Sequence, residues 1–107
     1  PSYGASWEGY VIEEVIHSVE PDDLYYWATH QGAEIDLVFM KGGRMYGVEV
    51  KRVDAPIMTP SMRIALEDLK LERIAVIYPD NKRYSLHKKV KVVPFEIISS
   101  GMKAVFG

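Results

Sequence analysis

Two acidic side chains, Asp36 and Glu49, have types and spacing that suit metal chemistry. Between them lie two runs of strand-forming residues separated by Gly42-Gly43. Two glycines supply the positive φ angles that a two-residue hairpin turn needs. Counting outward from this turn places Asp36 opposite Glu49, and Glu34 opposite Lys51, on one face of the hairpin.

Facing carboxylates destabilise a sheet because like charges repel. A divalent cation reverses the sign of this interaction, and hard oxygen ligands suit Mg²⁺ or Mn²⁺. Asp36 and Glu49 therefore predict a metal site. The alternative is that one carboxylate points to bulk water, or that Lys51 and Arg44 screen the pair.

The two faces of the hairpin predict how deeply that site lies. One face is almost wholly apolar, and the acidic face also carries several apolar or small residues. Both faces are therefore expected to be covered, which makes unpaired carboxylates costly. The apolar face is predicted to hold Ile35, Leu37, Phe39, Tyr46, Val48 and Val50, and the acidic face is interrupted by Val38, Met40, Met45 and Gly47.

A helix is predicted over residues 6–19, where Trp7, Val11, Val15 and Val19 recur at helical spacing. Glu8 lies beside this apolar stripe. Its position favours either an interaction with the helix dipole or a contribution to the acidic face, depending on whether the helix packs over the hairpin.

The remaining elements follow from local patterns. Residues 24–29 predict a strand, and its aromatic residues Tyr25, Tyr26 and Trp27 are expected in the core. A helix over 61–69 and a buried strand over 72–78 complete a βαβ unit, which favours parallel pairing of that strand with the second hairpin strand.

The last third of the chain is predicted to be less regular. Short strands are expected over 84–86 and 90–93, followed by a turn or short helix over 94–98, while residues 99–107 are expected to be frayed or loosely packed. Basic residues gather here, and they predict either a charged, aggregation-resistant edge or a local phosphate-contacting patch. These residues are Lys82, Arg83, Lys88, Lys89 and Lys91.

Composition sets limits on the whole chain. The 107 residues suit one domain with a modest core. A net charge of −2 gives no global case for nucleic-acid binding, and the lack of cysteine excludes disulfides and thiolate metal sites. No membrane-spanning run or signal peptide is visible, so a cytoplasmic protein without membrane contact is expected. The chain begins with Pro1-Ser2, which favours a segment of a longer protein.

The order helix, strand, hairpin, helix, strand, with Asp36 followed by Glu49-Val50-Lys51, resembles the PD-(D/E)XK nuclease superfamily. Ile35 stands where the superfamily name has proline. The resemblance implies an α/β restriction-endonuclease-like core, with a central mixed sheet flanked by helices.

A closer resemblance covers nearly the whole chain. Four segments look like the domain of unknown function at the C-terminus of many prokaryotic AAA-type ATPases, and the strand Val76–Tyr78 and the tail Val93-Pro94 also fit. These segments are Gly4-Ala5-Ser6-Trp7-Glu8, Tyr26-Trp27, Gly32-Ala33-Glu34-Ile35-Asp36 and Val48-Glu49-Val50-Lys51. The resemblance implies an ATPase domain upstream in the same chain.

The resemblance also implies roles for the acidic face. Asp36 and Glu49 would hold Mg²⁺ or Mn²⁺ with the carbonyl of Val50, and Glu8 would bind or orient the metal from the helix. Lys51 would position or activate the attacking water. Phosphodiester hydrolysis needs a Lewis acid and cationic stabilisation of the transition state, which this set supplies.

Three functions compete. The first is a metal-dependent endonuclease or exonuclease module acting on DNA or RNA. The second is a non-catalytic module that binds nucleic acid or a partner protein for the ATPase. The third is a homodimerisation domain that uses Tyr25, Tyr26 and Trp27 as an exposed surface.

Overall fold

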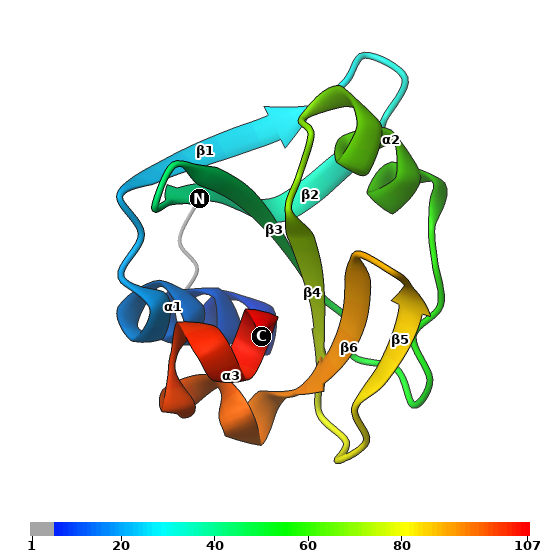
Figure 1. The fold of residues 1–107 in the computed structure, drawn as a ribbon. Coiled ribbons are helices and arrows are strands. Elements are labelled where there is room, and N and C mark those ends of the chain that lie inside the picture. Colours follow the sequence, from blue (N-terminus) through cyan, green and yellow to red (C-terminus); the bar gives the residue numbers. More distant parts are fainter. Residues whose placement is uncertain (1–5) are drawn as a thin grey trace.

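The computed structural model describes residues 6–107, which form a six-stranded mixed sheet flanked by helices (Figure 1). The strand order is β1-β2-β3-β4-β6-β5. The elements in chain order are α1 (Trp7–Val19), β1 (Asp23–Ala28), β2 (Glu34–Lys41), β3 (Arg44–Val50), α2 (Pro60–Asp68), β4 (Arg73–Tyr78), β5 (Tyr84–His87), β6 (Val90–Pro94), the 3-10 helix η2 (Phe95–Ser100) and α3 (Met102–Phe106).

The central hairpin has the predicted turn and register. Gly42 and Gly43 have φ angles of 60° and 79°, the left-handed conformation that glycine adopts at no steric cost. Lys41 pairs with Arg44, and the antiparallel ladder continues from there to Leu37 and Val48. The prediction of a tight glycine hairpin is confirmed.

The predicted βαβ unit is also confirmed. Strand β4 pairs in parallel with β3, and α2 lies between them in sequence. Thr59 caps α2, since its side chain accepts a hydrogen bond from Met62 N at 3.2 Å. Pro60 occupies the first turn, where its missing N–H costs nothing.

Helices cover both faces of the sheet, as predicted. In Figure 1, α1 and α3 lie on one side and α2 on the other. The core accordingly divides into two clusters of buried side chains. The first cluster joins α1, η2 and α3 to residues such as Phe39 and Val48. The second joins α2 to residues such as Val38 and Val76.

The C-terminal residues are ordered, so the expectation that 99–107 would be frayed is wrong. Helix α3 buries Val105 and Phe106 against the first cluster. The Phe106 ring lies 5.6 Å from that of Phe39 and 5.0 Å from that of Tyr46. The aromatic pair on the hairpin provides an apolar surface that these last residues cover.

Two predictions about which face residues occupy are also wrong. Ile35 packs in the second cluster, whereas Leu37 packs in the first, so the strict alternation of β2 breaks at Asp36. Of the aromatic residues of β1, Trp27 packs against the second cluster as predicted, but Tyr25 and Tyr26 lie outside the core on this edge strand. Tyr26 is 83% exposed and Tyr25 46% exposed.

No helix within residues 6–107 has both the length and the apolar character that crossing a membrane requires.

Candidate functional site

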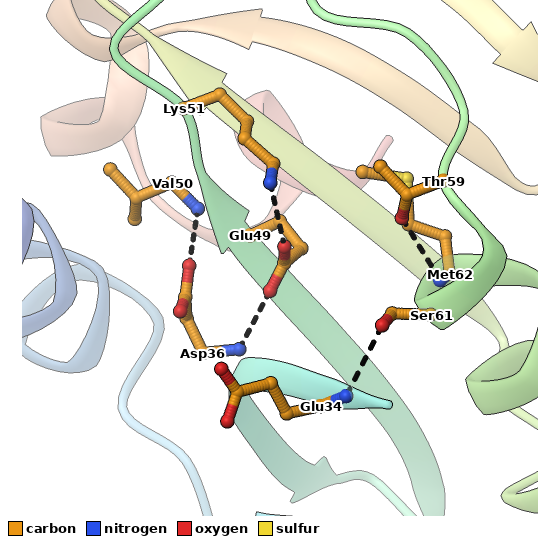
Figure 2. A network of polar contacts seen from close by, with 8 residues as sticks. All are labelled: Glu34, Asp36, Glu49, Val50, Lys51, Thr59, Ser61 and Met62. Carbon is orange, nitrogen blue, oxygen red and sulfur yellow. Dashed lines mark hydrogen bonds and ion pairs between the residues drawn. The ribbon is translucent and has the colours of Figure 1, made fainter. Parts of the chain in front are cut away.

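The candidate site lies where the central hairpin opens. The paired residues of β2 and β3 end at Leu37 and Val48. One residue further on, Asp36 N donates a hydrogen bond to Glu49 Oε1, and Val50 N donates one to Asp36 Oδ2, both at 2.8 Å (Figure 2). Each carboxylate therefore binds a backbone amide of the opposite strand.

Strand β2 changes face at this point because its pairing with β1 is irregular: Tyr25 pairs with Val38 and Trp27 with Ile35, so two residues of β2 lie opposite one of β1. The Asp36 carboxylate accepts a hydrogen bond from Val50 N, and the neighbouring Ile35 lies on the α2 side of the sheet. There it packs over Gly47, where a β-carbon would lie 3.4 Å from Ile35. Asp36 and Glu49 are thus brought together as predicted, through interlocking hydrogen bonds in place of a regular facing pair.

Lys51 completes the arrangement. Its Nζ lies 3.5 Å from Glu49 Oε2, and its backbone N donates to Ile77 O of β4 at 2.8 Å, which fixes the residue to the sheet. The screening alternative is therefore partly right: Lys51 offsets the charge of Glu49. Arg44 pairs with Lys41 at the far end of the hairpin, so it does not take part.

Burial perturbs both carboxyl groups. Glu49 is only 6% exposed, and desolvation, followed by the charge of Asp36, raises its pKa from 4.5 to about 7. Asp36 is an exposed residue, but the neighbouring protein partly desolvates its carboxylate. This desolvation raises the pKa of Asp36, against the opposing effects of the Val50 N–H and Lys51.

Glu34 contributes charge to the same region from the start of β2. Its negative charge adds to the rise in the pKa of Asp36. Its backbone N donates to Ser61 Oγ at 3.2 Å, which connects the site to the first turn of α2 (Figure 2). The hairpin register predicts Glu34 opposite Lys51, but the paired residues of β2 and β3 end at Leu37 and Val48, before this pair is reached. No sequence signal indicates the contact with Ser61.

Glu8 lies exposed in the first turn of α1, after the cap in which Gly9 N donates to Ser6 Oγ. This turn is beside the chain that leaves β3, since the Arg52 guanidinium sits 5.0 Å from the centre of the Trp7 ring. Across residues 6–107, no three Asp, Glu, His or Cys side chains gather as a metal-binding group, so Glu8 is not assembled with Asp36 and Glu49. Gly4 and Ala5 of the N-terminal motif lie outside the described residues.

The fold and site together define an α/β domain that presents two interlocked carboxylates and a lysine at the open end of its central hairpin. The family model described as "Domain of unknown function (DUF4143)" matches residues 3–98. The chain belongs to this family.

Two mycobacterial proteins are similar to the chain. They are the "Uncharacterized protein Mb2031c" of Mycobacterium bovis and the "Uncharacterized protein Rv2008c" of Mycobacterium tuberculosis, each 46% identical over 102 residues. These alignments cover 94% of this chain but only 23% of each relative, so the chain spans about a quarter of their length. No solved structure matches the chain.

Proposed function

We propose that this domain has a PD-(D/E)XK-like core and hydrolyses phosphodiester bonds of DNA or RNA with Mg²⁺ or Mn²⁺. The observation that carries the proposal is the interlocked pair Asp36 and Glu49 with Lys51 beside it. Two carboxylates this close, one of them buried, are costly in the absence of a cation.

The donor set fits a hard divalent ion. Mg²⁺ is commonly held by one or two carboxylates, with water and substrate phosphate completing its coordination. Asp36 and Glu49 would hold the ion, joined by the Val50 carbonyl. Such an ion supplies a Lewis acid for phosphodiester hydrolysis.

The protein's own groups have distinct roles in this proposal. Lys51, held by β4 through its backbone, orients the attacking water and offsets negative charge on the phosphate. Glu8 would orient the ion from the helix. The two backbone amides keep the oxygens of Asp36 and Glu49 in fixed positions before substrate arrives.

The test is a calorimetric titration of Mg²⁺ and Mn²⁺ into the 107-residue chain, its Asp36→Asn variant and a Glu13→Gln control. The asparagine side chain would retain the shape of Asp36 and remove its charge, whereas Glu13 is exposed on α1 and outside the network. Binding in the wild type and control that is lost in Asp36→Asn is expected. Labelled DNA and RNA strands incubated with Mn²⁺ should then be cut by the wild type and the control.

Two results would contradict the proposal. Equal metal binding by wild type and Asp36→Asn would place the ion elsewhere. If the protein binds both Mn²⁺ and the strands but leaves the strands intact, the proposed nuclease activity is contradicted, while the metal site still stands.

A second candidate, a non-catalytic nucleic-acid- or partner-binding module, is favoured by one observation. Lys51 and two backbone amides already compensate the carboxylates without an ion. Such a module would keep its binding activity in Lys51→Ala, whereas the nuclease would lose cleavage. An ATPase region elsewhere in the same polypeptide and a cytoplasmic location remain part of the proposal; the greater length of the mycobacterial relatives leaves room for such a region.

A further inference from the structure

A second polar site is a cavity of about 380 Å³ between α2 and the turn that joins β5 to β6. Its walls carry three cationic side chains and one carboxylate, so positive charge prevails. The lining residues are Arg63, Leu66, Glu67, His87, Lys88 and Lys89. The cavity is outside the network of Asp36 and Glu49.

The cations of this cavity have no carboxylate partner within the described part of the chain. Among residues 6–107 the only ion pair closer than 4.0 Å joins Lys51 to Glu49. Arg63, Lys88 and Lys89 are all exposed, although Glu67 lines the same cavity. Their donors are therefore available to an external anion.

Other basic residues of the segment are already engaged. Arg83 donates to the carbonyls of Ala104 and Gly107, and Lys91 donates to that of Gly107. Arg83 and Lys91 thus bind the C-terminal end of the chain, Lys88 and Lys89 line the cavity, and Lys82 is exposed outside both groups.

The turn that carries Lys88 and Lys89 is held by hydrogen bonds that its backbone carbonyls accept from other parts of the protein. Lys88 O accepts from Arg73 Nη1 at 2.9 Å, and Lys89 O accepts from Ile74 N at 2.8 Å. Lys89 N donates to His87 Nδ1 at 3.0 Å, so the proton of a neutral His87 ring is on Nε2. The cavity therefore has donors at its rim, and a phosphate would meet no competing carbonyl from this turn.

We propose that this cavity binds a phosphate group of a nucleic-acid strand and positions that strand for the acidic site. Helix α2 connects the two places, because Ser61 contacts Glu34 and Arg63 lines the cavity. The inference rests on the proposed function for its ligand.

The experiment measures binding of a labelled single-stranded oligonucleotide by fluorescence anisotropy in EDTA, at several KCl concentrations. The variants are Lys88→Gln/Lys89→Gln and the control Lys82→Gln, an exposed lysine of the same segment outside the cavity. Removing one phosphate contact should make the slope of log K against log salt shallower by about 0.7. Because the cavity is proposed to hold one phosphate group, the slope of the double variant should change by about this amount and its binding should weaken, while the control stays close to wild type.

The outcomes separate this inference from nuclease activity. If the double variant and Lys82→Gln lose oligonucleotide affinity equally, or if neither loses any, the assignment of the cavity as a strand-binding site is overturned. Equal competition by inorganic phosphate and by unlabelled strand, at matched phosphate concentration, would assign the cavity to a free phosphate and overturn strand positioning. Cavity-dependent binding by a protein that cuts nothing would support the inference and contradict the proposed function.

Discussion

Replacing Glu49 by Gln should stabilise the metal-free protein at neutral and alkaline pH. Glu49 is nearly fully buried, and its charge faces that of Asp36. A glutamine keeps the shape and an oxygen that can accept from Asp36 N, but it carries no charge to desolvate. The lost ion pair with Lys51 is a smaller effect, because the lysine is partly exposed.

The size of the gain follows from the pKa of Glu49. Its pKa is about 7 in the folded chain against an ordinary value of 4.5, and one pKa unit corresponds to about 1.36 kcal/mol. Ionised Glu49 therefore costs the folded state about 3 kcal/mol above pH 7. Between these two pKa values the folded state binds more protons than the unfolded state, so stability contributed by this group falls as pH rises. Below pH 4.5 the group is protonated in both states and the cost vanishes.

The assay is urea unfolding of wild type, Glu49→Gln and the control Glu13→Gln in EDTA, across about pH 4 to 8. The free-energy difference between Glu49→Gln and wild type should be near zero at the acid end. It should grow through the interval from 4.5 to 7 and level off near about 3 kcal/mol. Saturating Mn²⁺ should narrow or reverse this difference, since only the wild type retains both carboxylates.

Two results would refute the reasoning. A Glu49→Gln protein less stable than wild type at the alkaline end would show that the charge of Glu49 stabilises the fold. A difference that does not change with pH would show that Glu49 titrates alike in the folded and unfolded chains, and that burial does not shift its pKa.

The other predictions concern the same network and the core behind it. Mn²⁺ binding at about pH 6 should release protons, measurable by calorimetry in buffers of different ionisation enthalpy, and release should fall in Glu49→Gln. Lys51→Met should raise the pKa of Glu49 further, observable as a shift in its carboxyl NMR titration, because a favourable charge is removed. Phe106→Ala should cost about 3–5 kcal/mol of unfolding free energy in urea, and little change would show that α3 is dispensable. Gly43→Ala should destabilise by about 1 kcal/mol or more at its φ of 79°, and an unchanged midpoint would contradict the hairpin turn.

The local chemistry of the sequence predicts the hairpin and the elements around it. Gly42-Gly43 determines the turn, and the turn determines which residues of β2 and β3 pair. The meeting of Asp36 and Glu49 follows from that register. The crossed hydrogen bonds between the two residues do not follow from the register. They depend on a side chain that takes the place of a backbone acceptor at the open end of the ladder. A period-two pattern also cannot show the bulge at which two residues of β2 lie opposite one of β1, so it predicts the wrong face for Ile35.

Residues remote in sequence explain the other differences. Phe106 is buried only because Phe39 and Tyr46 stack beside it, and the sequence near the C-terminus does not encode that partner. Tyr26 has strand character, but its exposure depends on β1 being an edge strand. Edge and central strands of similar composition differ in their neighbours, which a single sequence does not reveal.

The site combines two properties that rarely serve folding alone. The crossed hydrogen bonds hold Asp36 and Glu49 rigidly at the open end of a central strand pair, which stabilises their positions. Their mutual repulsion and the burial of Glu49 raise the free energy of the same arrangement. A pair of hydrophobic residues would fill this place without the electrostatic cost. Under the proposed function a bound cation would offset this electrostatic cost, and carboxylates already held by backbone amides would need little rearrangement to bind it.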